Sequence, residues 1–171
     1  NLVSQNIIRD NHGGLGFIGI VVGDVLSTTV SRNRIFSNNT DAGAFYGIQS
    51  ISADSNSNAA LVNNMISLIA TADPAITTGV YDNGTAGTLN LFHNTIFIGG
   101  TALGNNSWAY HRSAGSPTNT TITGNIFFND RTGAGNHFAA GDGSANQGSW
   151  SSNYNIFVGT GSTPANFMDY G

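Results

Sequence analysis

The sequence lacks several residue types, and each absence narrows the possible folds and functions. It has no cysteine, which excludes disulfides, thiolate metal sites and a cysteine nucleophile. It has no lysine and no glutamate, two of the best helix formers, and only 8% of its residues are charged. A net charge of −4, with arginine as the basic residue, argues against nucleic acid and anionic membranes as partners. No apolar run approaches the ~20 residues of a membrane-spanning helix, so we predict no membrane span.

The chain is rich in Gly, Asn, Ser and Thr, and one pattern built from them recurs. An asparagine follows an aliphatic residue by three positions and precedes an apolar residue by two, as in Leu91–Asn94–Ile96. The pattern returns about every 30 residues, although its last copy has a polar first position. The asparagines of this column are Asn6, Asn33, Asn64, Asn94, Asn125 and Asn155.

A second column repeats in step with the first and identifies the kind of repeat. It consists of a Gly or Ala followed by an apolar residue: Gly19–Ile20, Gly47–Ile48, Gly79–Val80, Ala109–Tyr110 and Ala139–Ala140. After each column asparagine the residues alternate between two faces, with Ile96 and Ile98 on the same one, which is typical of a strand. Helical solenoids need 3.6-residue stripes of helix formers, and leucine-rich repeats need a leucine consensus. The sequence has neither.

These patterns predict an all-β protein. We expect a right-handed parallel β-helix, or β-solenoid, of about five to six coils of roughly 30 residues. Each coil would turn a corner at the column asparagine, which tolerates the left-handed conformation, and stacked amides would bond one another in a ladder. We expect residues 1–171 to be a single β-helix segment of a longer protein. The predicted core contains Ile35, Ile66, Leu91, Ile96, Ile98, Ile122 and Phe127.

Several stretches resemble a known class of repeat proteins. They are "NNMISL", "TTGVYDNGTAG", "HNTIFIGGTA", "WAYHRSAG", "TITGNIFFNDRTGAGNHFAAG" and "SSNYNIFVG", which cover most of residues 59–159. They resemble the right-handed parallel β-helix superfamily that includes pectate lyases. More narrowly, they are similar to the repeat regions of very large secreted bacterial surface proteins, often exported through type IX secretion. The resemblance implies a secreted or cell-surface location and specifies no activity.

One part of the repeat brings polar residues into line. The positions one and two residues beyond the apolar member of the second column hold Tyr81, Asp82, His111, Arg112 and Asp142 on three successive coils. We expect these five residues to form a small face and take them as the candidate residues for binding a sugar, with rings for stacking and charged groups for hydroxyls. The alternative is a ladder of alternating charges that steadies a solvent-exposed face, where ion pairs contribute only about 0–1 kcal/mol.

The remaining patterns favour binding over catalysis. The aspartates fall at different phases of the repeat without D-x-D or DD spacing, so we assign no catalytic residue. No HxH or HExxH occurs, and we predict no metal site and no cofactor. We expect a non-enzymatic extracellular module, structural or adhesive, with polysaccharide as its candidate partner. The alternative is part of a carbohydrate-active enzyme, either a polysaccharide lyase or a glycoside hydrolase. Unpaired strand edges at the ends predict end-to-end self-association or continuation in a longer chain.

Overall fold

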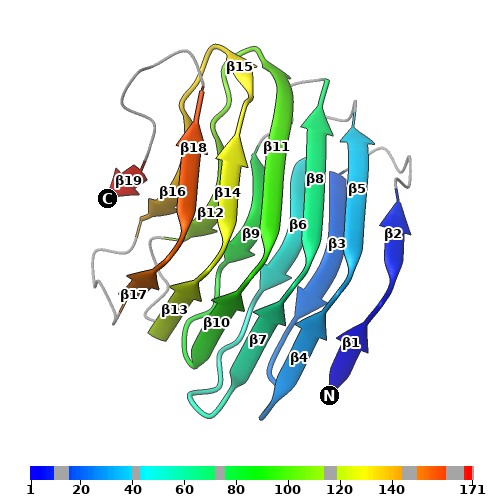
Figure 1. The fold of residues 1–171 in the computed structure, drawn as a ribbon, viewed down its shortest axis with the longest axis vertical. Coiled ribbons are helices and arrows are strands. Elements are labelled where there is room, and N and C mark those ends of the chain that lie inside the picture. The colour runs from blue at the N-terminus through cyan, green and yellow to red at the C-terminus, as the bar shows by residue number, and fades with distance from the viewer. Residues whose placement is uncertain are drawn as a thin grey trace.

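The protein forms a parallel β-solenoid, as predicted. The computed structural model describes residues 1–9, 16–39, 43–71, 76–113, 119–143, 150–160 and 168–170. Three parallel sheets form the walls of the solenoid (Figure 1). Along the stacking direction, each sheet contains a run of six hydrogen-bonded strands, one from each coil. Four interior coils therefore pair on both sides, and the two terminal coils pair on one. No helix in the described part of the chain is long and apolar enough to cross a membrane.

Each sheet takes one strand from every coil. The first sheet contains β1 (Leu2–Ser4), β4 (Thr28–Ser31), β7 (Asn58–Val62), β10 (Thr88–Phe92), β13 (Asn119–Thr123) and β17 (Trp150–Asn153). The second contains β2 (Ile7–Arg9), β5 (Arg34–Asn39), β8 (Met65–Ala70), β11 (Thr95–Ala102), β14 (Ile126–Asn129) and β18 (Ile156–Gly159), with the short β15 (Thr132–Gly133) paired to β11. The third contains β3 (Gly16–Val22), β6 (Ala44–Ser50), β9 (Thr77–Asp82), β12 (Ser107–Arg112), β16 (His137–Asp142) and β19 (Met168–Tyr170).

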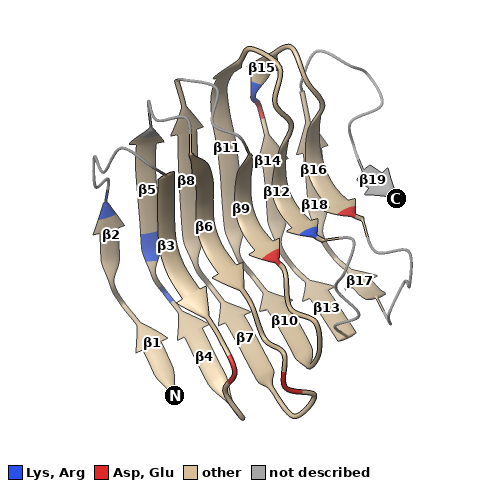
Figure 2. Cartoon of the chain, turned by 180° about the vertical axis from the view of Figure 1, so that it is seen from behind, with Lys and Arg blue, Asp and Glu red and all other residues tan. Residues whose placement is uncertain are grey.

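The path of the chain through one coil gives the handedness. In Figure 1 a coil rises on the near side through β4 and β5 and descends on the far side through β6. The reverse view in Figure 2 brings β3, β6, β9 and β12 to the front. Seen from the N-terminal end, the chain therefore turns clockwise as the coils advance away from the viewer, so the solenoid is right-handed. Parallel crossover connections favour the same hand.

The core lies between the three sheets and contains the residues expected there. All seven predicted core residues are at most 1% exposed. Ile96 shows how they stack, because it pairs in register with Ile66 on one side and Phe127 on the other. Each such buried side chain contributes about 1.5–3 kcal/mol. Gly79 explains the small residues of the second column: a Cβ built on it would lie 2.2 Å from Cγ2 of Ile96, so only glycine fits.

The asparagine ladder is confirmed at the corner between the first and second sheets. Nδ2 of Asn94 donates to Oδ1 of Asn125 at 3.0 Å and to the carbonyl of Leu61 at 2.8 Å. Oδ1 of Asn94 accepts from the backbone N–H and Nδ2 of Asn64 at 2.9 and 3.0 Å. The same amide-to-amide bond joins Asn6 to Asn33, Asn33 to Asn64, and Asn125 to Asn155.

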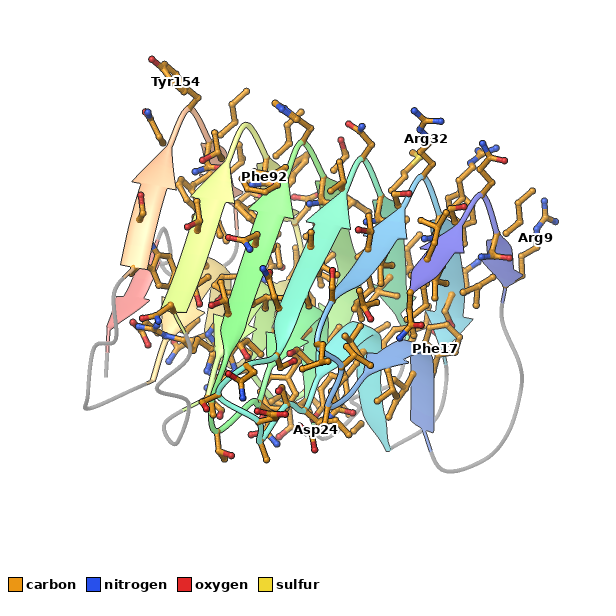
Figure 3. All side chains as sticks on the ribbon, turned by 90° about the horizontal axis from the view of Figure 1, so that it is seen from below. Arg9, Phe17, Asp24, Arg32, Phe92 and Tyr154 are labelled. Carbon is orange, nitrogen blue, oxygen red and sulfur yellow. The ribbon has the colours of Figure 1, made fainter. Side chains whose placement is uncertain are left out.

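The backbone of the corner differs from the prediction in one respect. The ladder asparagine is not the left-handed residue; the residue before it is, in all six copies of the motif. This residue is Gln5, Arg32, Asn63, His93, Gly124 or Tyr154, with φ between 54° and 69°. The ladder asparagine must direct its amide along the coil axis, so the residue before it adopts the left-handed conformation that turns the chain. Arg32 and Tyr154 project outward from the corner (Figure 3) and are exposed.

Candidate functional site

The residues predicted to bind a ligand stack at the ends of adjacent strands of the third sheet. Tyr81 and Asp82 end β9, His111 and Arg112 end β12, and Asp142 ends β16. His111 pairs with Tyr81, and Arg112 pairs with Asp82 on one side and Asp142 on the other. Figure 2 shows these strand ends coloured red, blue and red in turn. The predicted register is therefore confirmed.

The same strands place these residues on two different faces. Asp82 and Arg112 are fully buried and Asp142 is 4% exposed, whereas Tyr81 and His111 are partly exposed. Neighbouring side chains of a strand point to opposite sides, so the charged column faces the interior when the ring column faces solvent. The expectation of a single surface that combines rings and charges was wrong for this reason.

The charged column forms a buried ion pair. Nε of Arg112 donates to Oδ1 of Asp142 at 2.9 Å, and Nη2 bonds the other carboxylate oxygen, a bidentate geometry. The guanidinium also lies 5.4 Å from the ring centre of Trp150. Burial by itself would lower the pKa of Arg112, but the hydrogen bond and charge of Asp142 outweigh burial, so the pKa is raised. Oδ1 of Asp82 accepts the backbone N–H of Gly84 at 3.2 Å.

A second buried polar cluster lies at the opposite ends of these strands. The Ser107 hydroxyl and Nδ1 of His137 are 3.0 Å apart, and Asn129 donates to the Ser107 carbonyl at 3.0 Å. Arg131 donates to the Thr77 hydroxyl at 3.2 Å. All five residues are 0% exposed. The cluster was not predicted from the sequence, although Thr77, Ser107 and His137 share the 30-residue register. Because the cluster is enclosed in the core, we assign it a structural role.

The outer face of the third sheet carries a continuous row of stacked rings. Tyr46 stacks on Tyr81 with ring centres 4.8 Å apart, and Tyr81 stacks on His111 at 5.6 Å. His111 stacks on Trp108 at 4.3 Å, and Trp108 stacks on Phe138 at 5.8 Å. Adjacent rings deviate from parallel by at most 28°. We call Tyr46, Tyr81, His111, Trp108 and Phe138 the aromatic row; it spans the four interior coils.

A bend in the strand completes the aromatic row. Trp108 and His111 are three residues apart on β12, where strict alternation would place them on opposite faces. Between them, Ala109 and Tyr110 both belong to the core cluster, so the strand turns two consecutive side chains inward. Trp108 and His111 consequently share the outer face. Tyr46, Trp108 and Phe138 were missed by the sequence analysis, although their positions are in register along the sheet.

The two phenol groups of the aromatic row have raised pKa values and stay uncharged at neutral pH. Burial, followed by the charge of neighbouring Tyr81, raises the pKa of Tyr46 to about 12. Burial is also the largest cause of the raised pKa of Tyr81, whose hydroxyl lies 3.4 Å from Oδ1 of Asn83. Tyr46, Trp108 and Phe138 are only 7–9% exposed, and the indole N–H of Trp108 is buried without a hydrogen-bond partner among the described residues. The accessible part of the row is therefore mainly Tyr81 and His111, which combine ring surface with polar groups, a composition found at sugar-recognition surfaces.

Three further aspartates of the described chain accept hydrogen bonds from turns or from a neighbouring coil. Oδ1 of Asp24 accepts the backbone N–H groups of Ala53 and Asp54 at 2.5 and 3.1 Å, and these bonds lower the pKa of Asp24. Oδ1 of Asp54 accepts from Asn56 at 2.8 Å. Asp130 bonds the Thr160 hydroxyl. A carboxyl with a lowered pKa is a poor general acid, so Asp24 is not suited to be the acid of a glycosidase.

Neither a metal centre nor a known relative identifies the site. In the described residues, no three His, Asp, Glu or Cys side chains are placed to hold a metal ion. No family model, curated protein or solved structure matches the chain. What is shown of its relationships is the architecture itself, a parallel β-helix built from stacked coils.

Proposed function

We propose that this protein is a non-enzymatic extracellular module, structural or adhesive, that binds polysaccharide along the outer face of its third sheet. The observation that supports this proposal is the aromatic row, which runs parallel to the coil axis across four coils. Coils repeat every ~4.8 Å, which is close to the length of one sugar residue. An extended glycan laid along the axis would meet one or two rings of the row at each successive residue.

The chemistry of the aromatic row favours a neutral glycan. The charged residues of the neighbouring column, Asp82, Arg112 and Asp142, are turned into the core. Among the described residues, the outer face therefore offers ring edges, the phenol hydroxyls of Tyr46 and Tyr81 and the imidazole of His111. Such groups hydrogen-bond sugar hydroxyls and contact the apolar faces of sugar rings. A uronate polymer would meet no arginine on this face in the described part of the chain.

A secreted or cell-surface location belongs to the same proposal. It is supported by the resemblance of the repeats to those of large secreted bacterial surface proteins. The solenoid suits such a setting because each coil is stabilised by its neighbours, so the array forms a stiff spacer. The row of binding groups then lies on a rigid element, which holds it in place better than a loop does.

Binding to neutral and acidic glycans on an array, followed by titration against the best neutral oligosaccharide, tests the proposal. Tyr81→Ala and His111→Ala should each weaken binding about tenfold, because a lost aromatic contact costs on the order of 1 kcal/mol. Phe92→Ala is the matched control, since Phe92 is a partly exposed ring on the first sheet. Equal affinity in all variants with retained circular dichroism would refute the assignment to this face.

The enzymatic alternative makes a different prediction. A polysaccharide lyase or glycoside hydrolase needs carboxylates that reach the substrate, but Asp82 and Asp142 are buried and Asp24 and Asp54 cap turns. We expect no turnover of polygalacturonate or common glucans. Turnover that disappears in Arg112→Ala, with the fold retained, would move the enzyme to first place.

A further inference from the structure

A pocket lies on the outer face of the second sheet, on a different wall of the solenoid from the aromatic row. Arg34, Phe36 and Asn38 are alternate residues of β5, so their side chains share one face of that strand. Ile35 lies between the first two and belongs to the core, which makes the shared face the outer one. The pocket has a volume of about 380 Å³, and its lining comes from β2 and β5: Arg9, Arg34, Phe36, Ser37 and Asn38.

The pairing of β2 with β5 brings two arginines next to one aromatic ring. Arg9 pairs directly with Phe36 on the neighbouring strand, and Arg34 precedes Phe36 by two residues on the same strand. Neighbouring strands lie ~4.8 Å apart and alternate residues of a strand ~7 Å apart, so the three side chains stand beside one another. Figure 2 shows blue on both strands. The pocket therefore combines two exposed guanidinium groups with a partly exposed ring.

One of the two guanidinium groups is held in place by the ring. The guanidinium carbon of Arg34 lies 5.1 Å from the ring centre of Phe36, a cation–π contact. This contact restricts a long side chain that would otherwise sample many rotamers. Less conformational entropy is then lost when Arg34 binds a ligand, so its charge is preorganised for binding.

The protein itself does not explain why these two charges lie together. Among the described residues, neither Arg9 nor Arg34 forms an ion pair with a carboxylate. Two like charges side by side repel each other, so the pair does not serve stability. The arginines are not part of the stacking pattern either. On the next three coils their two columns continue with uncharged residues: Met65, Ser67, Thr95, Phe97, Ile126 and Phe128.

We infer from this arrangement that the pocket is a second binding site, which takes an acidic sugar carrying a carboxylate or a sulfate group. Guanidinium groups bind such oxyanions through pairs of N–H donors. The volume of about 380 Å³ lies within the roughly 300–1,000 Å³ of small-molecule pockets, which leaves room for a sugar ring beside its anionic group. Phe36 supplies apolar ring surface, and the exposed side chain of Asn38 supplies amide groups for hydroxyls.

Nuclear magnetic resonance titration at constant ionic strength tests the site with four probes: glucuronate, glucose 6-sulfate, glucose and inorganic sulfate. At least one acidic sugar should shift the Nε–H signals of Arg9 and Arg34 and bind at least tenfold more tightly than glucose or inorganic sulfate. The acid that binds more tightly identifies the anionic group. Arg9→Gln and Arg34→Gln should each weaken its binding about tenfold, because each removes a charged hydrogen-bond donor.

Arg32→Gln is the matched control. It removes the same charge from an exposed residue of the same coil as Arg34, and Arg32 does not line the pocket. Glutamine fits the left-handed conformation of this corner, since Gln5 occupies the equivalent position with a φ of 60°. The control should bind the acidic sugar as wild type does. An equal loss in Arg32→Gln would show a response to net charge alone and would overturn the site.

The remaining outcomes separate this site from the aromatic row. Failure of both acidic sugars to bind, or equally tight binding of glucose, would refute the pocket. Inorganic sulfate that binds as tightly as glucose 6-sulfate would refute the assignment to a sugar. Tyr81→Ala should leave the affinity for the acidic sugar unchanged, and Arg34→Gln should leave the affinity for the neutral oligosaccharide unchanged. Circular dichroism verifies that each variant folds, so either proposal can fail without the other.

Discussion

Removal of one interior ladder side chain should cost far more stability than removal of the first. The Asn94 side chain takes part in four hydrogen bonds: Oδ1 accepts two from Asn64, and Nδ2 donates to Asn125 and Leu61. Asn94→Ala removes all four and leaves the buried backbone N–H of Asn64 without its acceptor. At about 0.5–1.5 kcal/mol for each bond, with the orphaned group at the upper end, the expected loss is about 4 kcal/mol.

Asn6→Ala is the matched control. The Asn6 side chain is exposed, accepts no hydrogen bond from the described residues and donates only to Asn33 and Ser4. The expected loss is about 1 kcal/mol, because water replaces these partners at an exposed end. Urea unfolding measures both variants, with an unchanged m-value as the test that the unfolding unit is the same. Equal losses in Asn94→Ala and Asn6→Ala would refute the view that the buried ladder stabilises the corner.

Replacement of Asn94 by aspartate, its charged isostere, should make stability depend on pH in a defined direction. Asn94→Asp keeps the shape but replaces two donor bonds, to Asn125 and Leu61, by repulsion between oxygens. Burial raises the pKa of the new carboxyl in the folded state above its unfolded value of ~3.9. The protein should therefore be most stable relative to wild type below pH ~4 and lose that stability as pH rises through the folded pKa. A deficit that is independent of pH would contradict this reasoning.

Three further perturbations probe the core and its buried charges. Ile96→Asp should prevent folding or lower the thermal midpoint severely, as thermal circular dichroism would show, because the site is 0% exposed and offers the charge no partner. Arg112→Met should cost about 3–5 kcal/mol in urea unfolding by stranding the Asp142 carboxylate, and Asp142→Leu in the same chain should restore much of it. Burial raises the pKa of Tyr46 to about 12 and that of Tyr110 well above normal, so stability present below pH ~10 should be lost between pH ~10 and 12, in step with phenolate absorbance.

The fold could be predicted because its information is periodic. A coil that stacks on its neighbour must place equivalent residues one above another, so the asparagine column and the alternating Ile96 and Ile98 define register and core together. The position of the left-handed residue could not be predicted in the same way. Side chains as different as Gln5, Arg32 and Tyr154 occupy it with φ of 54–60°, which costs roughly 1–2 kcal/mol each. The ladder imposes that conformation, and the residue type contributes no signal.

The candidate site, too, could be predicted from the sequence only in part. Counting by two along β9 separates Tyr81 from Asp82, so the sequence alone contained the evidence that rings and charges face opposite ways. The aromatic row itself depends on the bend at Ala109 and Tyr110, where two consecutive side chains turn inward. The bend follows from packing between sheets, since small residues in this column admit side chains from the opposite wall. No local pattern in one strand encodes such a contact.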